Sequence, residues 1–117
     1  MKLIIAGGRE FNDYDLLCDE VSKFIANEKE VVIVSGLARG ADRLGCQFAA
    51  ENGYELRGFA AEWGKFGPAA GPIRNKIMAK NADALIAFWD GNSPGTMHMI
   101  DYANDMGLKV KVVQYDG

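Results

Sequence analysis

The chain has 117 residues, of which 49% are hydrophobic and 25% are charged, and its formal net charge is −3. This balance is typical of a single globular domain over residues 1–117 with a substantial core. No apolar run approaches the roughly 20 residues of a membrane-spanning helix, so we expect a soluble, cytoplasmic protein without a membrane partner. The acidic balance disfavours nucleic acid as a partner, because broad adhesion to it needs a basic surface.

Apolar segments and turn-forming residues alternate regularly along the chain. Continuous or alternating apolar runs predict five strands, at Lys2–Ala6, Val31–Ser35, Tyr54–Phe59, Ala84–Phe88 and Lys109–Gln114. Apolar residues at helical spacing predict four helices, over about 13–27, 40–52, 72–80 and 94–106, the first of them capped by Asp13. Four residues of the last helix are expected to face the core: Met99, Ile100, Ala103 and Met106. The stretch Ala60–Pro72 is predicted to be a long irregular loop.

This order of elements favours a three-layer α/β sandwich, a parallel sheet with helices on both faces. The first, second and fourth strands are wholly apolar and are predicted to be central. The third and fifth alternate with polar residues, so we place them at the edges and expect the third to expose one face. Right-handed crossovers then give the strand order 3-2-1-4-5. The chain reverses between the first and fourth strands, and ligands bind at the carboxyl ends of strands beside such a switch point.

The second strand runs into the loop Ser35-Gly36-Leu37-Ala38-Arg39-Gly40-Ala41-Asp42, which leads directly into a helix. Glycine permits close approach of a ligand to the backbone, and the start of a helix favours an anion. The guanidinium of Arg39 matches a phosphate or a carboxylate. We therefore expect Ser35, Gly36, Arg39, Gly40 and Asp42 to form a phosphate site, with Asp42 on a ribose hydroxyl or orienting Arg39. The alternative is a tight turn in which Asp42 only caps the helix.

Further candidate ligand-binding residues follow the other strands: Gly7, Gly8 and Arg9, then Trp63, then Arg74 and Asn75, and finally Ser93, Gly95 and Thr96. Each segment has a purely structural alternative. Arg9 is then solvated or paired with Glu10, and Arg74 forms a surface ion pair worth roughly 0–1 kcal/mol. Ser93 is then only an N-cap, and Trp63 anchors its loop instead of stacking on a base.

Basic residues recur in or just after the loops that follow strands: Arg9, Arg39, Arg43, Arg74 and Lys76. Their placement predicts a local positive pocket on an acidic body, which suits a small anion better than duplex DNA. His98 has no Cys or His at metal-ligand spacing, so we expect no metal and no cofactor beyond a nucleotide-derived ligand. Cys18 and Cys46 are expected to be reduced thiols.

Three segments and a residue pair follow one another along the chain. The segments are Gly7-Gly8-Arg9-Glu10-Phe11, Ser35–Asp42 and Gly71-Pro72-Ile73-Arg74-Asn75, and the pair is Gly95-Thr96 at the start of the last helix. Together they resemble the SLOG superfamily, which groups DprA-like proteins with the LOG phosphoribohydrolases, and especially its small YspA/YpsA-like branch. The resemblance implies a Rossmann-like fold, a pocket for nucleotides or nucleotide-derived ligands, and a bacterial or phage origin. The LOG enzymes carry a Pro-Gly-Gly-x-Gly-Thr-x-x-Glu signature with a catalytic Glu. Met99 stands at that position here.

These observations support three hypotheses. The first is a binding protein that senses, carries or sequesters a small anionic, nucleotide-like ligand. The second is an enzyme that cleaves or transfers a nucleotide N-glycosidic bond, which the missing Glu disfavours. Asp90 or Glu62 is then the better placed carboxylate. The third is a DprA-like accessory to DNA processing. An apolar helix face with Met97, Tyr102 or Trp89 would support a homo-oligomer.

Overall fold

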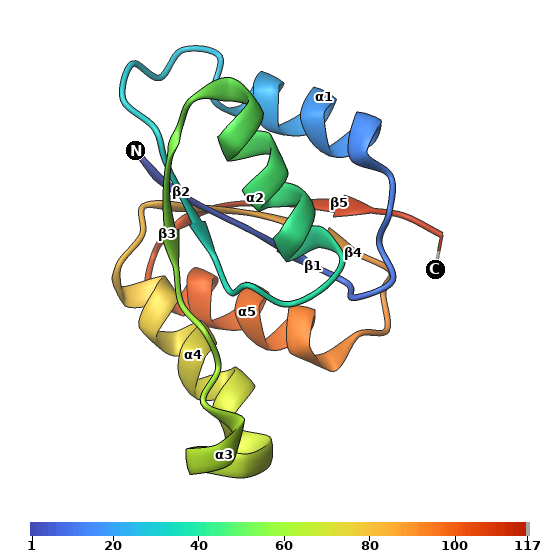
Figure 1. The fold of residues 1–117 in the computed structure, drawn as a ribbon, viewed down its shortest axis with the longest axis vertical. Coiled ribbons are helices and arrows are strands. Elements are labelled where there is room, and N and C mark those ends of the chain that lie inside the picture. The colour runs from blue at the N-terminus through green and yellow to red at the C-terminus, as the bar shows by residue number, and fades with distance from the viewer. Residues whose placement is uncertain (117) are drawn as a thin grey trace.

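The computed structural model describes residues 1–116. Strands and helices follow one another as β1 (Lys2–Gly7), α1 (Tyr14–Phe24), β2 (Val32–Ser35), α2 (Ala41–Asn52), β3 (Glu55–Gly58), α3 (Trp63–Phe66), a 3-10 turn (Gly67–Ala69), α4 (Ala70–Lys80), β4 (Ala84–Trp89), α5 (Pro94–Asp105) and β5 (Lys109–Gln114) (Figure 1).

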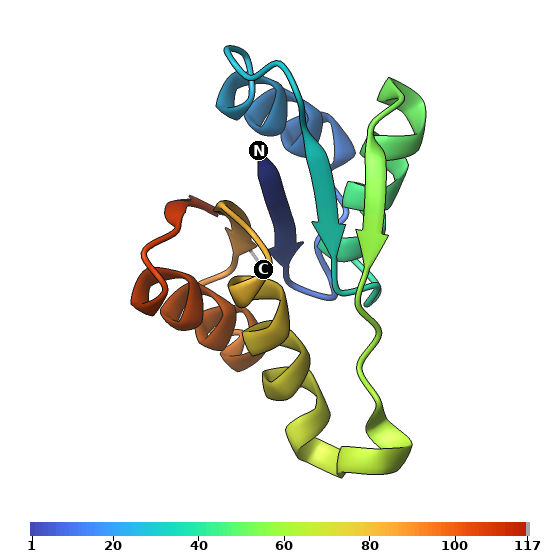
Figure 2. The same cartoon turned by 90° about the vertical axis from the view of Figure 1, so that its left-hand side faces the viewer.

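The five strands form one parallel sheet in the order β3-β2-β1-β4-β5, as the apolar pattern predicted. In the central strand β1, Ile4 is level with Val34 of β2 on one side and with Leu85 of β4 on the other. With α1 and α2 on one face and α4 and α5 on the other, the architecture is Rossmann-like (Figures 1 and 2). Successive strands are added on one side of β1 up to β3 and on the other side from β4 to β5, so the expected switch point lies between β1 and β4.

The central strands supply both halves of the core because alternate residues point to opposite faces. Leu3 and Ile5 of β1 belong to the cluster beneath α1 and α2, together with Leu17 and Phe48. Ile4 and Ala6 belong to the opposite cluster, beneath α4 and α5. A strand buried on both faces has to be apolar throughout, which explains the continuous apolar runs in β1, β2 and β4.

The prediction that Ala60–Pro72 is an irregular loop is partly wrong. Its middle forms α3 and a 3-10 turn, and α4 begins at Ala70 instead of near Pro72. Prolines are typical loop residues, but Pro68 and Pro72 lie in the first turn of their helices, where the missing amide hydrogen has no intrahelical acceptor to lose. The α3 segment projects away from the sheet (Figure 2).

Three smaller expectations also need correction. Helix α1 ends at Phe24 and not near Asn27, although Asp13 caps it as predicted by accepting from the Leu16 amide at 3.0 Å. Strand β3 is exposed along its whole length, because it is a short edge strand. Met106 is exposed and not inward, since α5 ends one residue earlier. Within residues 1–116 no helix combines the length and apolarity needed to cross a membrane.

We predict that Phe88→Ala lowers the free energy of unfolding by about 3–5 kcal/mol, the usual cost of truncating a buried aromatic residue. Phe88 is fully buried at the carboxyl end of β4, and its ring stacks on Phe11 at a centroid distance of 4.8 Å. Urea denaturation of both variants measures the effect, with the exposed Met106→Ala as a control that shifts stability by no more than about 0.5 kcal/mol. Equal losses in the two variants would contradict this account of the core.

Candidate functional site

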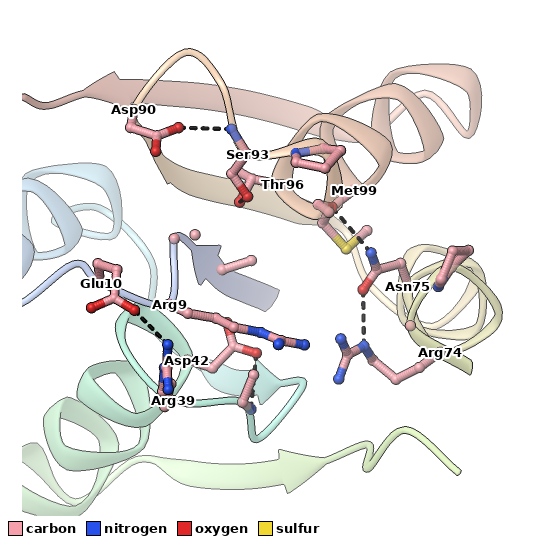
Figure 3. A pocket seen from close by; sticks show the side chains of 18 of the residues that line it. Arg9, Glu10, Arg39, Asp42, Arg74, Asn75, Asp90, Ser93, Thr96 and Met99 are labelled. Atoms are coloured by element: carbon pink, nitrogen blue, oxygen red, sulfur yellow. Dashed lines mark hydrogen bonds and ion pairs between the residues drawn. The ribbon is translucent and has the colours of Figure 1, made fainter. Parts of the chain in front are cut away.

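A cavity of about 470 Å³ opens at the carboxyl ends of β1 and β4, where the chain reverses direction. We call it the switch-point cavity; Figure 3 shows most of its lining. It brings together most of the candidate residues: Gly7, Gly8, Arg9, Arg39, Asp42, Trp63, Arg74, Asn75, Ser93, Gly95 and Thr96. Segments as far apart in the chain as Gly7 and Tyr115 meet here because parallel strands end at the same rim.

Three candidates, Ser35, Gly36 and Gly40, do not line the cavity but support the residues that do. Ser35 is fully buried; its hydroxyl donates to the Asp42 carbonyl at 3.2 Å and accepts from the Leu37 amide at 3.1 Å. Gly36 lies against the site, because a Cβ there would come within 2.8 Å of both Arg74 Nη1 and Asp42 Oδ2. Gly40 has a φ of +79°, and a side chain there would strike the backbone of Gly8 and Arg9.

The loop after β2 is not the amide cradle that its glycines suggest. The Leu37 amide is bound by Ser35, and the Ala38 amide donates to Asp42 Oδ2 at 3.2 Å. The Ala41 amide, at the start of α2, donates to the Gly8 carbonyl at 3.2 Å. These three amides hold the loop in shape and are therefore not free to bind an anion.

The guanidiniums of two arginines, Arg9 and Arg74, point toward one another in the cavity, and the Asp42 carboxyl lies beside Arg9 (Figure 3). Arg74 is held in place, because Nε donates to Asn75 Oδ1 at 2.9 Å and Nη1 donates to the Gly36 carbonyl at 2.6 Å. Arg9 comes from the loop after β1 and extends its guanidinium into the cavity. The positive charges of the two guanidiniums repel, and Asp42 attracts both.

Burial raises the pKa of the Asp42 carboxyl to about 6 from an ordinary 3.8, although the Ala38 amide, Arg74 and Arg9 pull the pKa down. Burial also lowers the pKa of Arg74, an effect that its attraction to Asp42 opposes. An arginine nevertheless stays charged near neutral pH. The floor of the cavity therefore holds a carboxyl group that changes its charge close to physiological pH.

The opposite wall is the start of α5. Asp90 Oδ1 accepts from the amides of Asn92 and Ser93, both at 2.8 Å, and these bonds lower the pKa of the Asp90 carboxyl. Ser93 is the N-cap residue of α5, and its hydroxyl accepts from Thr96 Oγ1 at 3.2 Å instead of capping the helix. Gly95 and Thr96 lie in the first turn of α5, where backbone amides lack intrahelical acceptors and the helix dipole is positive.

Arg39 has a different role from the one predicted. Its guanidinium donates to Glu10 on the exposed edge of the cavity, and both side chains are largely exposed. The expectation that Asp42 orients Arg39 is wrong, because Asp42 faces Arg9 and Arg74 (Figure 3). The sequence left open whether Glu10 pairs with Arg9. In the structure Glu10 pairs with Arg39 instead.

Trp63 lies at the mouth of the cavity, and 49% of it is exposed. The Arg9 guanidinium lies over its ring, 5.8 Å from the centroid. A Cβ on Gly71 would come within 3.2 Å of the indole edge, so the absence of a side chain at Gly71 makes room for it. Trp63 therefore packs against the site and remains accessible at its rim.

Several lining residues escaped the sequence argument, above all Tyr115, Met78 and Ala38. Tyr115 directly follows β5, and the rule that strands end at one rim would have found it. Its hydroxyl occupies the place that a side chain on Gly8 would need. Glu62 lies outside the cavity, against a separate groove near α3. Within residues 1–116 no three His, Cys, Asp or Glu side chains lie close enough together to hold a metal ion, and His98 is exposed on α5.

This architecture, with a polar cavity at the switch point, defines a Rossmann-like α/β protein that has its site at the carboxyl rim. The chain belongs to the YspA, cpYpsA-related SLOG family (YAcAr), whose model matches residues 1–66. It is 33% identical over 121 residues to the gene 61 protein of Mycobacterium phage D29, with 93% of each chain covered.

The fold is similar to that of DNA processing protein A (DprA) from Streptococcus pneumoniae, with a TM-score of 0.78 and 21% sequence identity. The similarity covers 98% of this chain and 50% of that one, so the chain spans half the length of DprA. At this level of identity the comparison establishes the shared fold.

We predict that Asp42→Asn removes a pH dependence of stability between about pH 4 and 6. Because the pKa of Asp42 rises on folding from 3.8 to about 6, its contribution to stability is complete below pH 3.8 and is lost as the pH rises through 6. The shift corresponds to about 3 kcal/mol. Urea unfolding at pH values from 4 to 8 should show the variant gaining stability relative to the wild type as the pH rises.

The exposed Asp101→Asn on α5 is the matched control, since it makes the same chemical change away from the cavity. Parallel stability curves for the wild type and Asp42→Asn would show that the carboxyl is not held in the unfavourable environment described.

Proposed function

We propose that the protein binds a nucleotide or nucleotide-derived anion in the switch-point cavity and acts as a sensor, carrier or sequestering protein. One observation carries the proposal: the guanidiniums of Arg9 and Arg74 point toward each other in the cavity, and one buried carboxyl, Asp42, lies close enough to attract both. The other carboxylates of the cavity are engaged, Glu10 with Arg39 and Asp90 with backbone amides, so one carboxylate faces two guanidiniums. A phosphate between them supplies the missing negative charge and matches the donors of arginine in geometry.

The remaining walls suit the other parts of a nucleotide. The start of α5 offers the first-turn amides and the Ser93 and Thr96 hydroxyls to a phosphate or a sugar. Ala6, Met78 and Met99 add an apolar surface, and Trp63 offers an aromatic face at the rim. A volume of about 470 Å³ is within the usual range for sites of small ligands.

We predict that Arg9→Ala weakens the binding of nucleoside monophosphates by about tenfold or more, the usual cost of losing a hydrogen bond to a charged group. Thermal shift with AMP, GMP, CMP and UMP identifies a bound nucleotide, because a ligand specific to the folded state raises the unfolding temperature. Calorimetry of that nucleotide with wild type and variant then measures the loss.

Lys76→Ala is the control: this exposed residue of α4 carries the same charge and is not part of the cavity lining. Arg39→Ala should weaken binding less than Arg9→Ala, because Glu10 already engages Arg39. Undiminished binding by Arg9→Ala would overturn the assignment of the site.

A second candidate function is cleavage of a nucleotide N-glycosidic bond. The observation that favours it is Asp42, a buried carboxyl in the cavity whose pKa of about 6 suits proton transfer near neutral pH. The position of the LOG catalytic Glu holds Met99, which is 1% exposed and cannot stabilise a developing positive charge. Glu10 and Asp90 both line the cavity and are both engaged, with Arg39 and with backbone amides.

Binding without turnover predicts that no free base accumulates when the protein is incubated with the same four monophosphates. Chromatography of the mixtures after hours at pH 6 and pH 8 measures this. Release of free base by the wild type, abolished in Asp42→Asn, would establish the enzyme instead.

A part in DNA processing similar to that of DprA is the third candidate, and it rests on the shared fold alone. The chain is acidic, with a net charge of −3, and the arginines that support ligand binding are found in the walls of two cavities. This arrangement favours a compact anion over a nucleic-acid backbone.

A further inference from the structure

A second cavity of about 360 Å³ adjoins the switch-point cavity on the side of the loop after β2. We call it the arginine cavity. It shares five residues with the first: Arg9, Ala38, Arg39, Trp63 and Arg74. Its other walls are Gly36, Leu37, Arg43, Ala60 and Ala61. Arg9 and Arg74 line both cavities, so one bound molecule can reach into both.

The two cavities differ sharply in charge. Three arginines and three carboxylates line the switch-point cavity, the latter being Glu10, Asp42 and Asp90. Four arginines and no carboxylate line the arginine cavity: Arg9, Arg39, Arg43 and Arg74. Of these, Arg43 is exposed on the first turn of α2 and forms no ion pair with any residue of the described range 1–116. Arg39 pairs with Glu10, and Arg9 and Arg74 lie near Asp42, so Arg43 is the arginine of this cavity whose charge no carboxylate within residues 1–116 compensates.

Two backbone amides of the arginine cavity are not free to bind an anion. The amides of Leu37 and Ala38 are already bound by Ser35 and Asp42. Leu37 has a φ of +61°, a left-handed conformation that an L-residue adopts at a cost of roughly 1–2 kcal/mol. Its side chain packs beside Gly58, at the end of β3. The loop thus holds a strained shape that leaves the cavity wall to arginine side chains.

We infer that the arginine cavity binds a second phosphoryl group of the same ligand, so that the natural ligand is a nucleotide with two phosphates. This inference rests on the proposed function and deepens it. The first phosphate lies between Arg9, Arg74 and the start of α5. The second lies on the other side of the Arg9 and Arg74 guanidiniums, where Arg43 is the donor that only the arginine cavity possesses. A nucleoside diphosphate and a pyrophosphate-linked compound such as ADP-ribose share this chemistry.

The test compares matched ligands on matched variants. Calorimetry at one fixed ionic strength measures the affinities of AMP, ADP and ADP-ribose, and of GMP and GDP, for the wild type, Arg43→Gln and Lys76→Gln. For at least one of the two bases, adenine or guanine, the wild type should bind the ligand with two phosphates about tenfold more tightly than the monophosphate of the same base. Arg43→Gln should abolish this preference and leave the affinity for the monophosphate unchanged, whereas Lys76→Gln should preserve the preference. Arg43 is exposed, so the substitution is compatible with folding.

The arms of the experiment separate the possible outcomes. A preference for ADP alone assigns the arginine cavity to a terminal phosphate, and a preference for ADP-ribose assigns it to an internal pyrophosphate. Binding of monophosphates with no gain from a second phosphate overturns the inference and leaves the proposed function standing. Absence of binding in every arm overturns both. Binding of a thymidine dodecamer that Arg43→Gln weakens, with equal affinity for AMP and ADP, would assign the cavity to single-stranded DNA and overturn the inference.

Discussion

The carboxyl rim of this protein depends on one buried carboxyl group, Asp42. It is rooted in the first turn of α2, on one face of the sheet, and it attracts Arg74 of α4, which belongs to the other face. Arg74 in turn donates to the Gly36 carbonyl at the end of β2. Helices that pack on opposite sides of the sheet are thereby joined across its edge. The absence of a Cβ at Gly36 is what allows these groups to meet.

Such an arrangement is costly for a small fold. Ionising a buried carboxyl is unfavourable, and a buried ion pair seldom repays the loss of hydration. The shifted pKa of Asp42 is the measure of this cost, and strongly shifted groups in a cleft are typical of functional sites. A second arginine, Arg9, on the same carboxyl leaves the cluster one negative charge short. We interpret this deficit as the physical basis of the ligand binding that we propose.

Membership of the YspA, cpYpsA-related SLOG family fits this picture while leaving room for different chemistries. Met99, which the resemblance to the LOG signature puts at the position of the catalytic Glu, is buried against the cavity and contributes apolar surface to it. The DprA chain that shares the fold is twice as long as the matched region. The charged groups of this chain lie in two adjoining cavities, one lined by three arginines and three carboxylates and the other by four arginines.

Much of the architecture followed from the sequence alone. The continuous apolar runs of β1, β2 and β4 determined the central strands and hence the strand order, because a strand covered on both faces can contain few polar residues. The strand order determined the switch point, and with it most of the cavity lining. What the tertiary structure alone decided is how the charges pair. Arg39 was the obvious clamp in the loop after β2, yet it pairs with Glu10, while Arg74, some 30 residues away, takes the place beside Asp42. Local spacing cannot predict such pairings, because they depend on which side chains the folded sheet brings within a few ångströms of each other.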